Sequence, residues 1–452
     1  MSNAHVLVLP FPAQGHVNPM MLLSKKLAKD GCKVTFVNTD FFHKKIKSAM
    51  ALGDSVNHDQ IHMVSIPDGM GPEDDRNELG KLCAAMLNTM PAKLEELIRG
   101  INCSSKGDNP ITCVLADLSM GWAMEIAEKM GIGRAVFWPQ AAASLALTVS
   151  IPKLIDDGII NSDGFPYEKQ MFKLSASIPS VDTAHFQWYC IGKTTTDKKN
   201  VFNYTARLVK YLQLANWSLC HTIHGLEPGA FSFLPELLAI GSLTAGNATG
   251  NSGGQFWSED STCLKWLDQQ QPRSVIYVAF GSYTLFSQTQ FQELALGLEH
   301  TNTPFLWVVR PGTTKGFPNG FQGIQGKIVD WAPQPQVLNH PSIACFLSHC
   351  GWNSTLEGLS NGVPFLCWPY FADQFLNKSY ICDVWKVGIG FQPDENEIVT
   401  RWELKKKVEQ LLGNEDIRRR SLELKEMAMN NNTAEASQCS QNFCNFIKWL
   451  KA

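Results

Sequence analysis

Residues 5–38 read HVLVLPFPAQGHVNPMMLLSKKLAKDGCKVTFVN. The apolar run at the start predicts a buried strand, and the apolar residues after it recur at the spacing of one helix face: Met20, Leu23 and Leu27. Asn18 is expected to cap this helix with Pro19 in its first turn, and Gly31 is expected to end it. The apolar run Lys33–Asn38 then predicts a second strand. A strand, a helix and a strand in this order form a βαβ unit, which indicates a parallel sheet.

The rest of the first half continues this alternation. A strand is expected at Thr112–Ala116, directly before Asp117, and another at Ala135–Trp138. A helix at Trp122–Met130 is expected to separate them. Residues 150–235 look like an insertion of helices and loops, in which no individual elements are predicted.

The same pattern restarts in the second half of the chain. Ser274–Phe280 predicts a buried strand, and later strands are expected at Phe305–Arg310, Ile343–Leu347 and Pro364–Trp368. Capping boxes are expected at the starts of two helices, formed by Ser287 with Gln290 and by Thr400 with Glu403. The chain therefore contains two successive units of the doubly wound α/β type.

The boundary between these units is expected at residues 241–254, which are rich in Gly, Ser and Asn, as flexible linkers are. A length of 452 residues also favours two to three domains. We expect a Rossmann-like domain over residues 1–240, a linker over 241–256, a second Rossmann-like domain over 257–435, and a C-terminal helix over 436–452 that packs back on the first domain. The predicted fold class is α/β, with two doubly wound domains facing each other across a cleft at the carboxyl ends of their strands.

Composition excludes several classes of partner. The formal net charge of -3 and the pI of about 6.4 give no general attraction to nucleic acid or to an anionic membrane. No stretch reaches the ~18 apolar residues of a membrane span, and the first apolar run is too short for a secretory leader. The 13 cysteines are an odd number without regular spacing, which favours unpaired thiols in a reducing cytosol. We therefore expect a cytoplasmic protein with no nucleic-acid partner and no membrane span, and a monomer.

The segment Trp331–Gln374 carries the residue types that a nucleotide sugar requires. The sequence from His349 to Ser354 follows a predicted strand and opens a helix, where free backbone N–H groups and the helix dipole favour a diphosphate. Trp331 offers a flat face for a base, and Glu357 can accept from ribose hydroxyls. Asp373 with Gln374, after the next predicted strand, can bind the hydroxyls of a sugar. Taken singly, a Trp is more often a core residue, and Asn-Ser at a helix start is more often only a cap.

His16 and Asp117 are the candidate catalytic residues. Each follows a predicted strand of the first sheet, so both belong to the edge that faces the cleft. A carboxylate that binds one imidazole nitrogen fixes the tautomer, makes the other nitrogen a better base and stabilises the imidazolium that forms. The competing interpretation is that His16 is an ordinary surface residue in a loop.

The segment of 44 residues (374 − 331 + 1) resembles the signature box of the plant secondary-product UDP-glycosyltransferases, with nearly every signature residue present in order. The resemblance extends over the whole chain, including Pro-Phe-Pro-Ala-Gln-Gly-His-Val-Asn-Pro at residues 10–19 and the position of the linker. It implies a GT-B fold, an N-terminal acceptor-binding domain, a C-terminal UDP-sugar-binding domain and inverting transfer to a small acceptor. His16 is then expected to be the general base, oriented by Asp117.

The resemblance also implies a role for each donor-site residue. Trp331 would stack on uracil beside the Ala332 backbone and Gln334, and Glu357 would bind ribose. The phosphates would be held by His349, Asn353, Ser354 and Ser282, and the sugar by Trp352, Asp373 and Gln374, with Gly15 also at the UDP-sugar. A closing Gln in this box is associated with glucose and a His with galactose, so UDP-glucose is the expected donor and co-substrate.

One position departs from the family pattern. Many members have a Thr after the third N-terminal strand that touches the sugar, whereas this chain has Pro139 there, followed by Gln140. Either Gln140 or a backbone group is expected to replace that hydroxyl, or the sugar is held less tightly on that side. Aromatic residues near the cleft suggest a phenolic or other apolar acceptor, and the expected acceptor-binding residues are Trp138, Gln140, Phe186, Trp188, Tyr283 and Phe371.

Three other functions were considered. An NAD-dependent oxidoreductase should carry a Gly-x-Gly-x-x-Gly turn after its first strand, where this chain has only Gly15. A serine hydrolase is suggested by Gly358-Leu-Ser-Asn-Gly362, but Ser360 falls near the end of a predicted helix rather than in an elbow. A non-catalytic protein that binds a nucleotide sugar or another small ligand would have lost His16 or Asp117, and both are present. No Asp-x-Asp follows a strand, so neither a metal nor a cofactor is expected.

Overall fold

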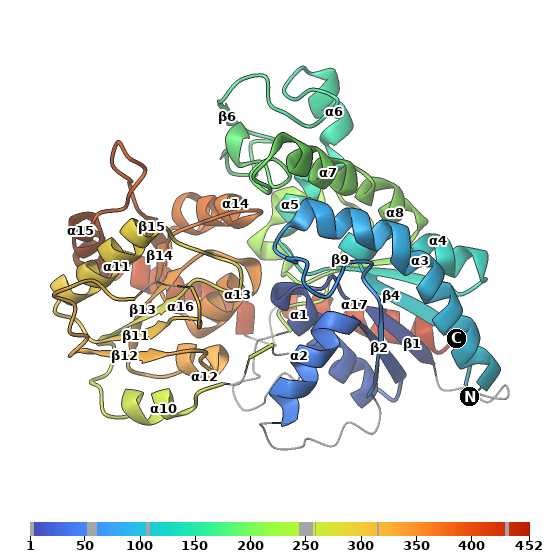
Figure 1. Ribbon diagram of the computed structural model, residues 1–452, viewed down its shortest axis with the longest axis horizontal. Coiled ribbons are helices and arrows are strands. Elements are labelled where there is room, and N and C mark those ends of the chain that lie inside the picture. Colours follow the sequence, from blue (N-terminus) through green and yellow to red (C-terminus); the bar gives the residue numbers. More distant parts are fainter. Residues whose placement is uncertain are drawn as a thin grey trace.

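The computed structural model describes residues 4–51, 61–104, 109–243, 256–257, 259–313, 316–429 and 434–452. Two α/β units lie side by side, one built from the first half of the chain and the other from the second (Figure 1). Most of the linker predicted at residues 241–256 lies outside the described residues. The predicted α/β fold class is confirmed.

The N-terminal unit contains a seven-stranded sheet in the order β3-β2-β1-β4-β5-β8-β9. All neighbouring strands in it are parallel. The strands are β1 (His5–Leu9), β2 (Lys33–Thr39), β3 (Ile61–Ile66), β4 (Cys113–Asp117), β5 (Gly133–Trp138), β8 (Trp217–Cys220) and β9 (Leu237–Ala239). The strand order reverses between β1 and β4, which is where open α/β sheets form a ligand crevice.

Helices cover this sheet and complete the unit. They are α1 (Gln14–Lys29), α2 (Asp40–Ala51), α3 (Leu79–Ser104), α4 (Ala123–Lys129), α5 (Ala142–Val149), α6 (Ile151–Asp156), α7 (Thr195–Ala206), α8 (Leu208–Leu214) and α9 (Pro228–Phe231). A small antiparallel pair, β6 (Met171–Phe172) and β7 (Val181–Asp182), interrupts the helices. The region 150–235, which sequence patterns left unassigned, thus supplies both the strand β8 and the helices α7 and α8.

The C-terminal unit contains a six-stranded parallel sheet in the order β12-β11-β10-β13-β14-β15. Its strands are β10 (Val275–Ala279), β11 (Phe305–Val308), β12 (Gly326–Val329), β13 (Ile343–Ser348), β14 (Phe365–Cys367) and β15 (Gly388–Gly390). Its helices are α10 (Thr262–Leu267), α11 (Gln288–His300), α12 (Gln334–Leu338), α13 (Trp352–Asn361), α14 (Gln374–Ser379), α15 (Arg401–Leu412) and α16 (Glu415–Met429). Every residue of β1, β4 and β10 is buried, as expected for parallel strands covered by helices on both faces.

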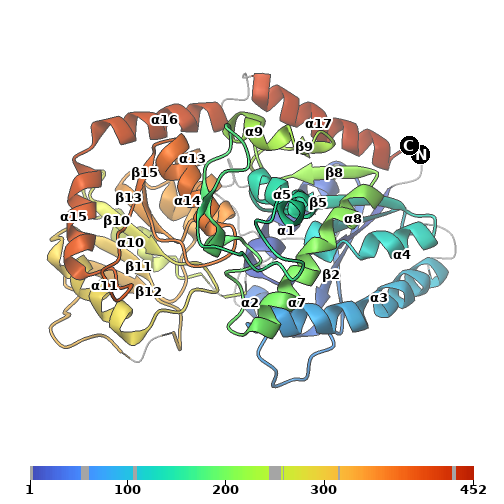
Figure 2. The same cartoon turned by 90° about the horizontal axis from the view of Figure 1, so that it is seen from above.

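The last helix, α17 (Ala434–Leu450), returns to the N-terminal unit. Phe443, Phe446 and Leu450 join the core cluster that contains β1 and β2, and the Asn442 side chain donates to the carbonyl of Ala239 over 2.8 Å. Figure 2 shows α16 and α17 running in succession over the two units, so that the C-terminal end of the chain lies on the N-terminal unit.

The first helix begins earlier than predicted, at Gln14 rather than after Asn18. The carbonyl of Ala13 accepts from the N–H groups of His16 and Val17, both at 2.9 Å, which closes the turn without a side-chain cap. Pro19 therefore lies inside the helix. Because Pro19 has no N–H, the carbonyl of Gly15 is left without its helical partner.

Both predicted capping boxes form only in part. Ser287 and Thr400 do cap α11 and α15 through the N–H groups of Gln290 and Glu403. The reciprocal bonds are replaced. The Gln290 side chain instead exchanges two hydrogen bonds with the backbone of Val399, and the Glu403 side chain accepts from the N–H of Gln392. Longer-range pairing between α11 and the start of α15 thus overrides the local motif.

No helix in the described ranges combines the length and the apolar character that crossing a bilayer requires.

Candidate active site

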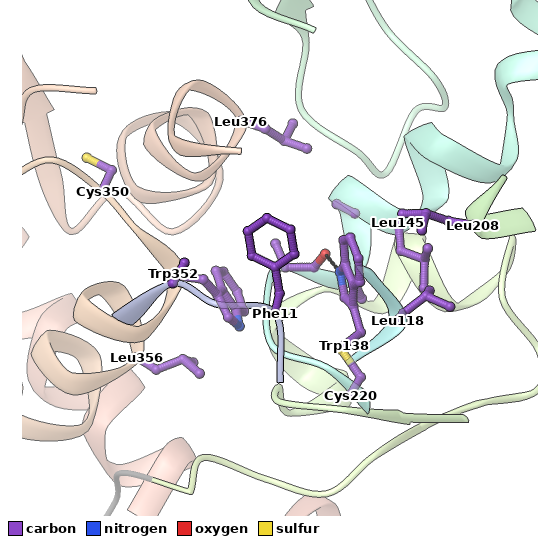
Figure 3. Packing of buried hydrophobic residues seen from close by; sticks show 14 of the residues in the cluster. Phe11, Leu118, Trp138, Leu145, Leu208, Cys220, Cys350, Trp352, Leu356 and Leu376 are labelled. Atoms are coloured by element: carbon purple, nitrogen blue, oxygen red, sulfur yellow. Dashed lines mark hydrogen bonds between the residues drawn. The ribbon is translucent and has the colours of Figure 1, made fainter. Parts of the chain in front are cut away.

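A cavity of about 330 Å³ lies between the two units. The carboxyl ends of β1 and β5 border it on one side, and those of β10 and β13 border it on the other. Figure 3 shows where the units meet, with Phe11 drawn between Trp138 of the N-terminal unit and Trp352 at the start of α13. The cavity is lined by His16 and by every residue predicted to bind the donor, namely Gly15, Ser282, Trp331, Ala332, Gln334, His349, Trp352, Asn353, Ser354, Glu357, Asp373 and Gln374.

His16 and Asp117 are in direct contact. His16 Nδ1 lies 2.6 Å from Asp117 Oδ2, and the side chain of His16 is 17% exposed while that of Asp117 is 0% exposed. The other carboxylate oxygen of Asp117 accepts from the N–H of Ser119 at 2.8 Å. His16 sits in the first turn of α1 rather than in the loop expected from the sequence, and Asp117 ends β4. Asp117 is therefore fixed behind His16 and does not itself line the cavity.

The second ring nitrogen of His16 faces residues that line the cavity. His16 Nε2 is 3.5 Å from the side-chain nitrogen of Gln140, and the ring of Phe11 lies 5.2 Å from the imidazole, centre to centre. Because Nδ1 is occupied by the carboxylate, the proton-accepting lone pair is on Nε2. The arrangement suits proton abstraction from a group bound in the cavity.

The first turn of α13 and the turn after β10 form one end of the cavity. Asn353 and Ser354 are in that first turn, and the N-cap Gly351 has no side chain, so the backbone N–H groups there are accessible. The ring of His349 is packed so closely that a Cβ at Gly281 or Gly351 would lie 2.6 or 2.4 Å from its Nε2. Glycine is thus required at both places.

His349 is neutral in this protein. Burial, and next the charge of Arg310, lower the pKa of His349 to about 4. His349 can therefore offer a hydrogen bond to an anion, but it does not bring a positive charge of its own at neutral pH. Any positive potential for an anion bound here must therefore come from the helix terminus and other groups.

Asn353 connects the units directly. Its side-chain nitrogen donates to the carbonyl of Gly15 over 2.5 Å, which is the carbonyl that Pro19 leaves unpaired in α1. Trp352 makes a second connection, because its indole N–H donates to the carbonyl of His221 over 2.7 Å. The indole of Trp352 is 3% exposed, so its hydrogen-bonding group is used between the units and is not free for a ligand.

A hydrogen-bonded group of polar side chains lines the cavity beside the first turn of α13. The amide nitrogen of Gln334 donates to Glu357 Oε2 at 2.6 Å and to the hydroxyl of Ser354 at 2.8 Å, while its oxygen accepts from Tyr277 at 3.1 Å. Burial raises the pKa of Glu357 to about 7. Trp331 stacks on Trp257, with centroids 4.7 Å apart, and its ring borders the cavity beside this group.

Asp373 and Gln374 lie at the start of α14, near His16. Burial raises the pKa of Asp373 to about 6, while Asn377 and His16 oppose that shift. Asp373 accepts from the side chain of Asn377 at 2.9 Å. The oxygen of Gln374 accepts from the N–H groups of Tyr370 and Phe371, at 2.8 and 3.1 Å, which directs the amide group and leaves its NH₂ as the donor for a ligand.

The prediction that Phe186 and Trp188 line the acceptor pocket is wrong. Phe186 and Trp188 are 0% and 1% exposed, and neither lines the cavity. They pack on each other at 5.1 Å, and the indole N–H of Trp188 donates to the carbonyl of Gly164. The residue between them, Gln187, lines the cavity instead. The remaining predicted residues, Trp138, Gln140, Tyr283 and Phe371, do line it.

Sequence patterns missed several lining residues. Leu79 and Cys83 come from α3, Val201 and Tyr204 from α7, and Glu259 from the segment before α10. The helical faces of α3 and α7 carry apolar residues toward both core and cavity, and spacing alone cannot separate the two. Glu259 follows the Gly-rich linker and had no motif to mark it.

The match of residues 358–362 to Gly-x-Ser-x-Gly is not a nucleophile elbow, because Ser360 lies inside α13 and is 4% exposed.

Comparisons with known proteins identify the family of this chain. A family model described as "UDP-glucoronosyl and UDP-glucosyl transferase" matches residues 258–430, and one described as "Glycosyltransferase, N-terminal domain" matches residues 2–150. UDP-glycosyltransferase 83A1 of Arabidopsis thaliana is 44% identical over 100% of this chain and 98% of its own length. (R)-mandelonitrile beta-glucosyltransferase of Prunus dulcis is 34% identical over 85% of this chain and 84% of its own.

Solved structures of the same kind superpose on the whole chain. A UDP-glucose: anthocyanidin 3-O-glucosyltransferase in complex with UDP has a TM-score of 0.82 at 25% identity, with 100% of both chains covered. Os79 of O. sativa in complex with UDP has a TM-score of 0.78 at 25% identity, covering 98% of this chain and 100% of its own. The predicted GT-B fold is confirmed, and the oxidoreductase and non-catalytic alternatives are set aside. The chain belongs to the plant UDP-glycosyltransferases, enzymes that transfer a sugar from a UDP-sugar donor.

Proposed function

We propose that this enzyme transfers glucose from UDP-glucose, with inversion, to a hydroxyl group of an apolar small molecule, with His16 as the general base and Asp117 as its orienting carboxylate. The observation that carries the proposal is the 2.6 Å contact between His16 Nδ1 and Asp117 Oδ2 at the wall of the cavity. That contact leaves His16 Nε2 as the free base.

The donor would lie along the C-terminal unit. Uracil would stack on Trp331, and ribose hydroxyls would donate to Glu357. The diphosphate would occupy the N-terminus of α13, where the backbone N–H groups and the helix dipole favour negative charge. Asn353, now bonded to Gly15, would be within the same region and could exchange that partner for a phosphate oxygen.

The transferred sugar would lie between the α14 start and His16. Asp373 can accept from sugar hydroxyls and the NH₂ of Gln374 can donate to them, which supports a hexose at this position. Gln374 favours glucose by resemblance, and two of the similar proteins are named for glucose transfer. Gln140, whose side-chain nitrogen is 3.5 Å from His16 Nε2, is proposed to supply the polar contact that Pro139 cannot make.

The chemical step follows from this arrangement. His16 Nε2 would take the proton of the acceptor hydroxyl as its oxygen attacks the anomeric carbon, and the bond from that carbon to the diphosphate oxygen would break. The electron pair would leave with UDP, whose growing charge would be stabilised at α13. Asp117 would stabilise the imidazolium, which then returns its proton to solvent.

The N-terminal half of the cavity supports an apolar acceptor. Its wall combines Phe11 and Trp138 with Leu79, Val201 and Leu208, and side chains such as Gln140 and Gln187 add polar groups to it. Pockets of this type bury most of a small apolar ligand and orient it through a few hydrogen bonds. Two similar proteins are named for (R)-mandelonitrile and anthocyanidin, which supports an aromatic acceptor for this chain as well.

No metal or other cofactor is proposed to take part. The leaving diphosphate would be stabilised by the helix terminus and by hydrogen bonds. Full activity is therefore expected in excess EDTA, and strict dependence on added Mg²⁺ would contradict this account.

The decisive experiment compares His16→Ala with the wild-type enzyme, using UDP-glucose and a panel of phenolic and aliphatic alcohols. We expect kcat to fall about 10³-fold, while the Kd of UDP measured by calorimetry stays within twofold. His300→Ala is the matched control, because His300 stacks on Trp402 and does not line the cavity. Unchanged turnover by His16→Ala would rule out the base, and an α-linked product by NMR would rule out inversion.

A further inference from the structure

A turn on the donor side is held from behind by a single arginine. Arg310, just after β11, donates to the carbonyl of Ser282 and to the carbonyl of Thr284, both at 2.6 Å. These carbonyls belong to the turn that begins at Gly281, whose φ of 67° is left-handed. Ser282 and Tyr283 line the donor cavity, whereas Arg310 does not.

The two bonds fix the direction of the backbone. In a trans peptide the C=O of one residue and the N–H of the next lie in the same plane and point in opposite directions. With the Ser282 carbonyl turned toward Arg310, the N–H of Tyr283 must point away from Arg310. No hydrogen bond joins the N–H of Ser282 or Tyr283 to another group in the described part of the chain. The turn thus presents unused donors of the kind that cradle a phosphate.

Arg310 also carries a charge that no carboxylate balances. It forms no ion pair with any described Asp or Glu, and its side chain is half-buried. Burial lowers the pKa of Arg310, and no acidic group offsets that effect. A cation that is partly buried away from water without a counter-ion destabilises the folded protein. A group that is absent from the empty enzyme but arrives with the substrate can supply the missing negative charge.

The charge acts on the cavity from close range. Gly281 lies against the ring of His349, and Arg310 is the neighbouring charge that lowers the pKa of His349. His349 and the start of α13 are the proposed diphosphate site. The field of Arg310 therefore extends to the place where the donor's negative charge would lie.

We propose that Arg310 is a positioning residue for the donor, which orients the Ser282–Thr284 turn toward the diphosphate and serves as its counter-charge from behind that turn. The proposal rests on the location of the diphosphate given under the proposed function. It assigns to Arg310 the positive charge that neutral His349 does not carry. In this proposal Arg310 does more than hold the turn in place, because its charge also acts on the diphosphate.

The test measures how strongly the enzyme prefers UDP to uridine, because the two ligands differ only in the diphosphate. Kd values are measured by calorimetry at pH 7.5 for wild type, Arg310→Gln, Arg310→Lys and Arg401→Gln. Arg401 is the control, since it pairs with Glu293 on a surface away from the cavity. We expect Arg310→Gln to weaken UDP binding about tenfold and uridine binding less than twofold, whereas Arg401→Gln changes neither.

Arg310→Lys separates charge from geometry, because Lys keeps the charge but cannot donate in the same two-pronged way. We expect it to retain the preference for UDP within threefold. Two results would overturn the proposal that Arg310 is the counter-charge. One is an equal loss of UDP and uridine binding in Arg310→Gln. The other is a preference for UDP over uridine that falls as far in Arg310→Lys as in Arg310→Gln. Wild-type enzyme that binds uridine but not UDP would instead contradict the proposed diphosphate site.

The pKa of His349 gives a readout that a clamp alone would not move. Removing the charge in Arg310→Gln should raise the pKa of His349, observed by NMR titration of its ring protons, and Arg310→Lys should raise it less. Equal pKa values in the wild type and Arg310→Gln would show that the arginine's charge does not reach the site.

Discussion

The donor and acceptor halves of the cavity differ in how the chain builds them. On the donor side, most lining residues come from one stretch, Trp331–Gln374, which runs through α12, β13, α13, β14 and the start of α14. On the acceptor side, the wall is assembled from α3, the loop at Gln187, α7 and α8, which are far apart in the sequence. A site built from consecutive turns and strand ends leaves a readable pattern, whereas a wall built from the sides of several helices does not.

The difference has a physical basis. Binding a diphosphate requires particular groups, such as the free N–H groups of a helix start and glycines that let the backbone approach, so residue type and spacing are constrained. An apolar wall requires only surface of suitable shape, which many residues can supply and which a core also needs. Phe186 and Trp188 illustrate this, because their type is right for a pocket and they are core residues.

The largest expected effect tests the point where the halves meet. Asp117→Asn should lower kcat about 10³-fold, because the amide cannot stabilise the imidazolium and can favour the wrong tautomer of His16. The Kd of UDP should stay within twofold, since Asp117 does not line the cavity. Steady-state kinetics and calorimetry on the same sample measure both quantities. A comparable loss of UDP binding would mean that Asp117 supports the donor half as well, which would break the division between the halves.

A smaller effect is expected at Phe186, which was wrongly predicted to bind the acceptor. Phe186→Ala should remove about 3 kcal/mol or more of stability, because Phe186 is 0% exposed and packs on Trp188 and Phe172. Thermal unfolding should shift to lower temperature while KM for the acceptor, measured well below the transition, changes less than twofold. Gln187→Ala is the matched comparison, since Gln187 itself lines the cavity and its replacement should alter the acceptor KM. Unchanged thermal stability together with a changed acceptor KM in Phe186→Ala would show that Phe186 belongs to the acceptor pocket.

Much of the fold could be predicted from the sequence. Buried parallel strands are continuous apolar runs, and β1, β4, β10 and β13 fall within one or two residues of the runs that predicted them. The start of α1 could not be predicted, because the turn at Ala13 closes through backbone bonds without a capping side chain. The elements of 150–235 were also unreadable, since β8 has only four residues and lies in a region of short helices.

For the site, chemistry that requires unusual residues was the most predictable part. His16 and Asp117, 101 positions apart, were expected as a pair because each was placed after a predicted strand at the same sheet edge and because the family resemblance assigns both to catalysis. What the sequence could not provide was the environment of each group. The neutral state of His349 and the raised pKa of Glu357 follow from burial, which depends on the packing of both units.

The smallest expected effect concerns Glu357 on the donor side. Burial is the main cause that raises its pKa to about 7, the amide of Gln334 opposes the shift, and the charge of Glu259 adds to it. If only the carboxylate accepts from ribose, a pKa of about 7 makes the binding-competent form rise roughly tenfold between pH 6 and pH 8. Uridine is the ligand of choice, because it lacks phosphates that titrate and does not reach Asp373. Calorimetry should show uridine binding strengthening about tenfold over this interval.

Glu357→Gln should remove that pH dependence, because the amide resembles the protonated acid at every pH. The same raised pKa has the opposite effect on the empty protein. The folded state holds the proton of Glu357 more tightly than the unfolded chain, so the stability from this group is fully present below the unfolded value of 4.5 and is lost as pH rises through about 7. The wild type should therefore lose thermal stability relative to Glu357→Gln between pH 6 and pH 8, while it gains affinity for uridine. Uridine affinity that is flat with pH in the wild type, together with this loss of stability, would show that Glu357 titrates as expected but does not bind ribose.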